Sequence, residues 1–494
     1  MRGATAPAKG HEHGPGAAGW PEAAVLAGLL GAGLALRLFH LGAASFWFDE
    51  AASVLASRTG GVAGPFPLPE PPGWTLCLRA WWLLPVPPTE WWARLPAALA
   101  GALVAPLTWL VARRWLDPAG AFIAAVLAAA SPVGVLFSQE CRMYSLLAAL
   151  GLAALLALAR SRPAAYAVTV AAGGCLHPGF LFALPAHAVA AMAEPPRRSG
   201  RGLVLAALAG AVPGIVLALL RSRDLGWVVA HPLEPALPWG GLGLRALELA
   251  GPGPRLAGAL RLTGLMAFAA TALAGLAALR TGPRVVLASL VGLPLAVLQA
   301  LARMGLVAPP QLRYVIGSQP LFLVACAAGC ARLGPRWRWA ALGCLLAVNG
   351  ASLRAMSAGG PFGGGLMAAK KPLRDVAAFV RSRARPGDAI VHVSMSSAIP
   401  FRLYLPEWPD QPYLLADPSI TPAETRWLGE ARPFGVAVAG ARRVWLVVSP
   451  VLWSDPPAVP AALGPELERR CRPPIRWEFP GVEVYLAPVR GGAR

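Results

Sequence analysis

The chain has 494 residues, of which 56% are hydrophobic and only 14% are charged. Soluble domains carry about 25% charged residues, so the composition argues against a string of soluble domains. The net charge of +20 would suit a nucleic-acid-binding protein, but no basic run is interleaved with aromatic residues. We therefore expect a protein that lies in the lipid bilayer and has no nucleic-acid partner.

Apolar runs of about 16 to 24 residues, the length that crosses a bilayer core, recur along the first two thirds of the chain. They predict an all-α polytopic module with about eleven transmembrane helices. The first run, residues 21–42, is too long for the core of a signal peptide and is expected to remain as an uncleaved anchor. The other runs are centred near residues 103, 127, 151, 170, 185, 211, 268, 293, 322 and 345.

Arginines between the runs predict the orientation of the helices. With the N-terminus inside, every loop predicted on the inner side carries arginine, as the positive-inside rule requires. These residues are Arg113 and Arg114; Arg160 and Arg162; Arg197, Arg198 and Arg201; Arg280 and Arg284; and Arg332, Arg336 and Arg338. Residues 164–193 are interpreted as two short helices that meet near His177; one long helix there would invert the topology of everything that follows.

Polarity divides the chain into four predicted parts. Residues 1–20, rich in Gly, Ala and Pro, are expected to be a disordered cytoplasmic tail. Residues 21–355 form the transmembrane module, and residues 356–369 form a Gly-rich linker. Residues 370–494 are expected to be a small extracytoplasmic α/β domain. Its predicted elements are a helix with Leu373, Val376, Ala377 and Val380 on one face, and strands near 389–394, 443–449 and 482–487.

The first outer loop contains two short segments with helical spacing of apolar residues. The spacing is carried by Trp47, Ala51, Val54 and Leu55, and again by Trp74, Leu78, Trp81 and Trp82. We expect two amphipathic helices that lie in the membrane interface with their tryptophans at headgroup depth. The polar residues Asp49, Glu50, Ser53 and Ser57 fall away from the apolar stripe.

Four outer segments concentrate the residues that could carry chemistry. They are Phe46-Trp47-Phe48-Asp49-Glu50-Ala51, Glu70-Pro71-Pro72-Gly73-Trp74, Ser138-Gln139-Glu140-Cys141-Arg142-Met143-Tyr144 and Gln311-Leu312-Arg313-Tyr314. Each also has a structural interpretation: a solvated helix N-terminus, a helix start, a surface salt bridge and an interfacial anchor. Acids this close to a bilayer are costly unless they are solvated or functional. The residues alone leave both interpretations open.

Taken together with Arg37 near the end of the first run, these segments resemble a known family in content and order. The chain is similar to the GT-C glycosyltransferases, in particular the branch of protein O-mannosyltransferases and aminoarabinose lipid A transferases. The resemblance spans about residues 25–335, and its specific parts are the Asp-Glu pair and the Ser-Gln-Glu-x-Arg-Met-Tyr run. Two positions depart from the family: Glu70 stands where His, Asn or Lys is common, and Gly73-Trp74 stands where Leu-Tyr is usual.

The resemblance implies an inverting glycosyltransferase in the inner (plasma) membrane of a bacterium. Its donor would be a sugar on a polyprenyl phosphate from the outer leaflet, and its unidentified acceptor a hydroxyl of an envelope lipid, glycan or protein. Asp49 would be the catalytic base, and Arg142 and Arg313 would hold the leaving phosphate. The other donor-binding residues implied are Glu50, Glu140, Tyr144, Tyr314 and His177. No cofactor or metal ligand is assigned, because the family divides on whether a divalent metal ion assists.

Other functions are compatible with the residues alone. A polytopic lipid or solute transporter, such as a flippase, would carry ionisable groups near the bilayer midplane and paired broken helices. The predicted break at His177 fits this in part, whereas the acids lie in outer loops. A non-catalytic envelope scaffold would not need the Asp49–Glu50 and Glu140–Arg142 groups. Because every motif precedes residue 335, we expect the C-terminal domain to cover the site or select acceptors.

Overall fold

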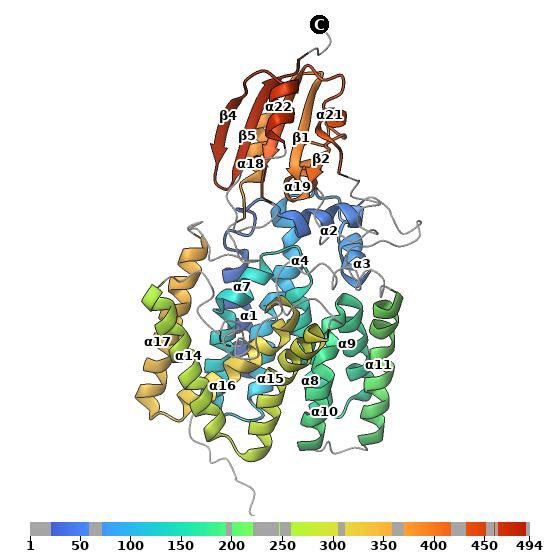
Figure 1. The fold of residues 1–494 in the computed structure, drawn as a ribbon. Helices are drawn as coiled ribbons and strands as arrows, with labels where there is room; N and C mark the ends of the chain where they lie inside the picture. Colours follow the sequence, from blue (N-terminus) through green and yellow to red (C-terminus); the bar gives the residue numbers. More distant parts are fainter. Residues whose placement is uncertain are drawn as a thin grey trace, which may run out of the picture.

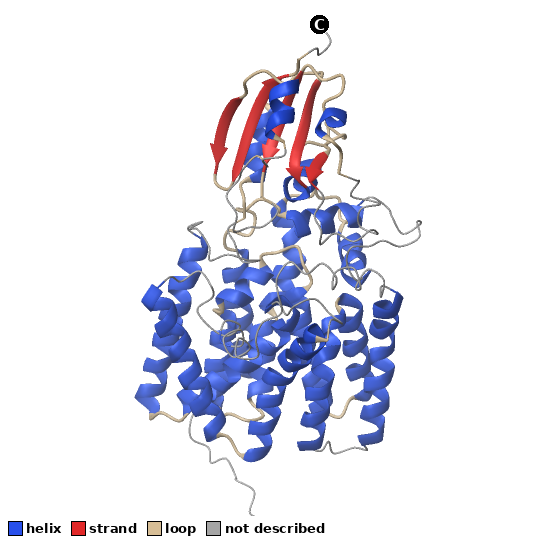
Figure 2. Ribbon diagram, in the orientation of Figure 1, coloured by secondary structure: helices blue, strands red, loops and turns tan. Residues whose placement is uncertain are grey.

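A computed structural model of the chain consists of a bundle of helices that carries a smaller α/β unit at one end (Figures 1 and 2). It describes residues 21–58, 72–193, 200–220, 247, 258–304, 312–357, 370–415, 431–450, 459 and 463–490. The predicted tail 1–20 and the predicted linker from residue 358 onward lie outside the described residues.

The bundle is built from α-helices and two 3-10 helices. Its elements are α1 (Glu22–Leu38), α2 (Phe48–Arg58), α3 (Pro72–Trp81), α4 (Glu90–Ala102), α5 (Val104–Ala112), α6 (Pro118–Ala129), α7 (Pro132–Ser138), α8 (Tyr144–Ala159), α9 (Pro163–Leu176), η1 (Pro178–Ala183), α10 (Leu184–Ala193), α11 (Gly200–Leu220), α14 (Gly258–Ala278), α15 (Thr281–Arg303), η2 (Leu312–Ser318), α16 (Gln319–Ala331) and α17 (Pro335–Ser357). A helix therefore lies in each apolar run expected from the sequence.

Several of these helices are long and apolar enough to cross a membrane. In the described part of the chain six segments meet this criterion, or seven if α6 and α7, bent by 50° at their junction, form one broken span. The helices α8, α9 and α10 are apolar but shorter. The chain is thus a multi-pass membrane protein, and the count of eleven spans stays a prediction.

The predicted break at His177 is confirmed. Helix α9 ends at Leu176, and His177 adopts an extended backbone with φ −162° and ψ 129°. The ring of Pro178 disfavours a helical conformation at the residue before it, which explains why the helix stops there. The His177 Nδ1 atom then accepts a hydrogen bond of 3.0 Å from the backbone N–H of Gly179 and so begins η1.

Small residues allow the central helices to approach closely. Helix α16 is buried along almost its whole length and packs against α14. A Cβ atom added at Gly275 of α14 would collide with the backbone of Ala325, and one added at Gly329 of α16 would collide with the backbone of Thr271. Backbone contact of this kind replaces the hydrophobic driving force that is absent between helices in lipid.

Helix α2 corrects the expectation of a one-sided interfacial helix. Its polar residues Glu50, Ser53 and Ser57 are buried along with its apolar residues. The reason is that α2 is covered from above by α19 (Met395–Tyr404) of the α/β unit while it packs on α3 below (Figure 1). Covered on both faces, the helix keeps Glu50 away from water and leaves only Asp49, of its two acids, partly exposed.

The α/β unit contains a mixed five-stranded sheet in the order β2-β1-β3-β5-β4. Its elements are α18 (Leu373–Arg381), β1 (Asp388–Ser394), α19, β2 (Tyr413–Leu415), α21 (Phe434–Ala437), β3 (Arg443–Val448), α22 (Gly464–Arg470), β4 (Ile475–Phe479) and β5 (Val482–Pro488). Strands β2 and β3 pair with β1 in parallel, and β5 pairs with β3 and β4 in antiparallel fashion. Strands β2 and β4, at the two edges, were not expected.

Polar contacts attach the α/β unit to one end of the bundle. The hydroxyl of Tyr404 donates to Glu90 Oε1 at 2.8 Å and accepts from the backbone N–H of Phe46 at 2.7 Å. Arg374 Nη1 also donates to Glu90 Oε1, at 3.1 Å. The unit thereby covers the segment between α1 and α2 and also α2 itself, whose first turn carries the Asp-Glu pair.

Candidate active site

Asp49 lies against two arginines that come from distant parts of the chain. Its Oδ2 atom is 3.0 Å from Arg313 Nη1 and 3.8 Å from Arg142 Nη2. Arg142 also donates to the Asp49 carbonyl at 3.4 Å and to Ser53 Oγ at 3.2 Å. The Asp49 side chain is 20% exposed, so it is reachable from outside the protein. The result is one carboxylate between two guanidinium groups at the end of the bundle that carries the α/β unit.

Glu50, the next residue, is fully buried and points into the scaffold. Arg94 donates two hydrogen bonds to its carboxylate, at 2.7 and 2.9 Å, and Lys370 donates a third at 2.9 Å. Arg94 also donates to the carbonyls of Leu41, Ala44 and Ser45. Burial alone would raise the pKa of Glu50, but the charges of Arg94 and Lys370 outweigh burial and lower that pKa to about 2.

Glu50 also fixes the loop that carries Arg142. The backbone N–H of Cys141 donates to Glu50 Oε1 at 2.8 Å. On the other side of the same residue, the Cys141 carbonyl accepts a hydrogen bond of 3.1 Å from Trp74 Nε1. Both backbone polar groups of Cys141 are therefore paired, which holds the following residue, Arg142, beside Asp49. The Gly73-Trp74 pair, which departs from the family pattern, thus has a structural role. Trp74 holds the Cys141 carbonyl. Gly73 is required because a Cβ there would lie 2.7 Å from the Cys175 carbonyl oxygen.

The base of the same loop is attached to the first helix by a buried arginine. Arg37 Nε donates to Ser138 Oγ at 3.1 Å, and Arg37 Nη1 donates to the carbonyls of Gly33 and Ala129 at 3.1 Å. The Ala129 carbonyl lies at the break between α6 and α7, where the helical hydrogen bonds are interrupted. Gly101 leaves the room for this contact, since a Cβ there would collide with Ser138.

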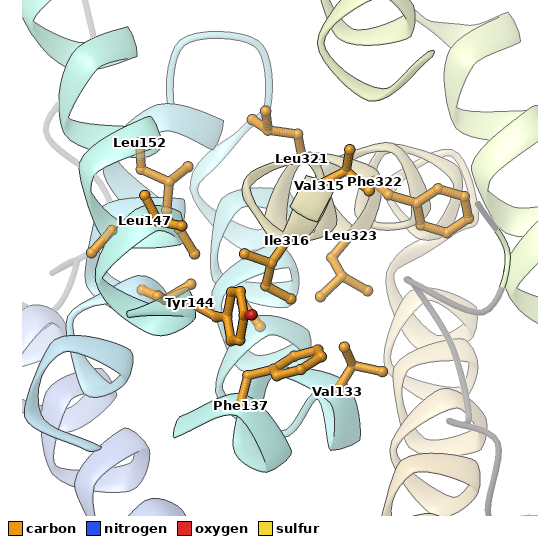
Figure 3. Close-up of a cluster of buried hydrophobic side chains, with 14 of the residues drawn as sticks. Val133, Phe137, Tyr144, Leu147, Leu152, Val315, Ile316, Leu321, Phe322 and Leu323 are labelled. Atoms are coloured by element: carbon orange, nitrogen blue, oxygen red, sulfur yellow. The ribbon is translucent and has the colours of Figure 1, made fainter. Parts of the chain in front are cut away.

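Aromatic rings line the arginine pair. The Arg142 guanidinium lies 5.7 Å, and that of Arg313 5.9 Å, from the ring centre of Tyr144. His177 stacks on Tyr314 with a centroid distance of 5.1 Å and lies 6.5 Å from Tyr144. Figure 3 shows Tyr144 next to Phe137 in the apolar cluster that α8 forms with α7 and α16, which fixes the ring in place. All eight site residues expected from the sequence are therefore gathered in one region.

Glu140 is buried without a hydrogen bond to its carboxylate from any described residue. Burial raises the pKa of Glu140 to about 7, and the charges of Glu50 and Asp49 act in the same direction. The charges of Lys370 and Arg313 oppose this increase. Glu140 is therefore an acid that changes its charge near neutral pH.

The charge pattern suits an anion better than a metal ion. Within the described part of the chain, no group of three or more His, Cys, Asp or Glu is placed to hold a metal. Asp49 faces two cations, and Glu50 has its oxygens occupied by Arg94, Lys370 and the Cys141 N–H. The guanidinium pair offers planar donors of the kind that bind phosphate.

Two residues of the site escaped the sequence analysis: Arg94 and Lys370. Arg94 had a usable signal, because an arginine inside an apolar helix is costly and must be paired or functional. Lys370 had no usable signal. It follows a Gly-rich segment, and no local pattern predicts its contact with Glu50, 320 residues earlier in the chain.

Comparisons with known proteins identify the fold of the chain. The sequence model of the family described as dolichyl-phosphate-mannose-protein mannosyltransferase matches residues 70–218. No curated protein matches the chain. The crystal structure of ArnT from Cupriavidus metallidurans in the apo state superposes with a TM-score of 0.61 at 13% identity, over 94% of this chain and 98% of that one. The structure of the same protein bound to undecaprenyl phosphate gives a TM-score of 0.58 at 14% identity, over 95% and 99%.

The chain has the fold of ArnT. The resemblance to GT-C glycosyltransferases that the motifs predicted is thereby confirmed, and it extends over the α/β unit because nearly the whole of both chains is covered. At 13–14% identity the likeness concerns the fold, and the roles of individual residues have to be argued from the site itself.

The position of Glu140 leads to a test that does not require a substrate. A carboxyl with a pKa of about 7 in the folded state and 4.5 in the unfolded state keeps its proton longer when folded. The free energy of unfolding should then fall as pH rises from about 4.5 to 7 and level off above that. Glu140→Gln should remove this slope, measured as the Tm of the purified protein between pH 5 and 8. Glu22→Gln, at the exposed start of α1, is the control; an unchanged slope in Glu140→Gln contradicts the assignment.

Proposed function

We propose that the chain is an inverting glycosyltransferase that moves a sugar from a polyprenyl-phosphate donor to a hydroxyl of an envelope acceptor at the outer face of the membrane. The observation that carries this proposal is the contact of Asp49 with Arg142 and Arg313 at the outer end of a membrane bundle. A base and two phosphate-binding cations are what such a transfer needs. The undecaprenyl phosphate bound to ArnT, a protein of the same fold, supports a lipid-phosphate donor.

In this mechanism the two arginines hold the phosphate as it leaves the anomeric carbon, and Asp49 takes the proton of the attacking hydroxyl. The rings of Tyr144, Tyr314 and His177 form a wall beside the arginines. We assign Glu50 to the scaffold instead of to donor contact, because it is fully buried and each of its oxygens is already paired. Purified protein tested with a panel of polyprenyl-phosphate sugars decides the reaction and identifies the sugar.

We predict that Asp49→Asn folds, binds donor nearly normally and loses turnover. The amide keeps the shape of the side chain but cannot accept the proton, and loss of a general base typically costs about 10²–10⁴ in rate. The measurement is sugar transfer by the purified variant, with donor binding followed separately. Glu140→Gln is the companion variant. If Asp49→Asn turns over at more than roughly a tenth of the wild-type rate while Glu140→Gln is inactive, the base lies instead in the loop that carries Glu140.

Arg142→Lys and Arg313→Lys should each weaken donor use strongly. A guanidinium presents two parallel donors to a phosphate, whereas an ammonium acts as a point charge on a flexible stem. We expect a loss of roughly tenfold or more in donor affinity for each variant, the scale of one charge-assisted hydrogen bond of about 1.5–3 kcal/mol. Arg79→Lys on α3 is a matched control outside the site. Wild-type affinity in both site variants argues against phosphate binding by this pair.

We also propose that the chain lies in a bacterial inner membrane, with its N-terminus in the cytoplasm and residues 370–494 outside. The arginine-bearing loops support this orientation. In a cysteine-free background, Ser382→Cys, exposed at the end of α18, should react with an impermeant maleimide in right-side-out vesicles. Arg280→Cys, exposed before α15, should react only after the vesicles are opened. The reverse pattern contradicts the topology.

A further inference from the structure

Lys370 brings a positive charge from the α/β unit into the candidate site. Its ammonium donates to Glu50 Oε2 at 2.9 Å and lies 3.5 Å from the carbonyl oxygen of Gln139. The Lys370 side chain is only 13% exposed, and Glu50 is fully buried. One lysine therefore contacts two of the segments that make up the site: helix α2, which carries Asp49 in its first turn, and the loop that carries Arg142.

The contact of Lys370 is transmitted to Arg142 in two short steps. Glu50, the partner of Lys370, accepts the N–H of Cys141 at 2.8 Å. Gln139, whose carbonyl faces Lys370, lies on the other side of Glu140 in the same loop. The lysine thus holds the loop on both sides of Glu140, and Arg142 follows directly after Cys141.

The charges in this region explain why the lysine is needed. Of the two buried carboxylic acids, Glu50 is paired with Arg94, whereas the strongest favourable charge acting on Glu140 is that of Lys370. A buried charge without a partner is strongly unfavourable, so a second cation is required if both acids are to ionise. Lys370 supplies that cation. Arg313 and Asp49 are the other charged groups that act on Glu140 from neighbouring elements.

We propose that Lys370 is a positioning residue of the donor site, through which the C-terminal unit holds the loop that carries Arg142. The inference rests on the proposed function and changes one of its parts: the C-terminal unit is not only a cover or an acceptor-selecting domain, but completes the donor site. Donor binding and turnover then depend on this unit through a single side chain.

Neighbouring residues separate this role from simple attachment of the unit. Lys371, the next residue, donates to Ser449 Oγ at 2.8 Å inside the α/β unit. Arg374 attaches the unit to the outer loop through Glu90 and the carbonyls of Gly42 and Ala43. Arg374 therefore serves the same interface without a contact to Glu50 or to the loop of Arg142, which makes it a matched control.

The test compares full-length Lys370→Met, Lys370→Arg and Arg374→Gln with the wild type. The first measurement is the Kd for undecaprenyl phosphate in nanodiscs, and the second is turnover with the active donor. A misplaced site of this kind loses roughly 10²-fold in turnover, which we expect of Lys370→Met together with about tenfold weaker binding. Lys370→Arg, which keeps the charge, should recover to within about threefold, and Arg374→Gln should stay within about twofold of the wild type.

A third measurement separates positioning from a loss of folding. Removing the cation should raise the pH at which Glu140 titrates, so the Glu140-dependent slope of Tm with pH should extend to higher pH in Lys370→Met. If Lys370→Met is too unstable to purify, Lys370→Met/Glu140→Gln, which removes one charge of each sign, is compared with Glu140→Gln alone. Weaker undecaprenyl phosphate binding in the double variant supports the inference.

Two outcomes overturn the inference. If Lys370→Met keeps the affinity and turnover of the wild type, Lys370 is not a positioning residue. The same conclusion follows if the double variant keeps the affinity and turnover of Glu140→Gln. An equal loss in Arg374→Gln shows that general attachment of the unit matters, and not Lys370. A wild-type protein that binds no undecaprenyl phosphate and transfers no sugar overturns the proposed function as well, so the two failures are distinguishable.

Discussion

The buried carboxylate of Glu50 is the constraint on which the rest of the site depends. It is fully removed from water and is matched by Arg94, Lys370 and the Cys141 N–H. These partners come from a bundle helix, from the α/β unit and from the loop between α7 and α8. Because an unpaired charge is so unfavourable inside a protein, the three parts must stay together for the carboxylate to remain ionised. The site is therefore held rigid by the partners that replace water around the Glu50 carboxylate.

The Asp-Glu pair divides two tasks between adjacent residues. Successive side chains on a helix point about 100° apart, so Asp49 and Glu50 at the start of α2 face different surroundings. Asp49 faces the arginines and is partly exposed, whereas Glu50 faces the scaffold and is not. A single acid could not both hold the loop in place and remain open to a substrate, because the partners that fix a carboxylate also occupy its lone pairs.

Local patterns in the sequence predicted most of the helices and the site motifs. The break at His177 was predictable because a proline follows it, and the arginine-bearing loops and apolar runs are properties of short segments. Strand β4 was predictable as well, because Arg476 and Glu478 alternate with apolar residues in the way typical of a half-buried strand, but it was not predicted. The burial of α2 and the role of Lys370 were beyond reach, since both result from contacts between segments more than 300 residues apart.

The contact between Asp49 and the two arginines has a further consequence in the proposed mechanism. Without donor, Asp49 is the counter-ion that compensates Arg142 and Arg313, so the cations need not be buried unpaired. A donor phosphate that binds the same guanidinium groups takes over this compensation. In the proposed mechanism the two arginines then hold the phosphate, and the Asp49 carboxylate is released from them to contact the acceptor hydroxyl, so that the base and the sugar come into place together.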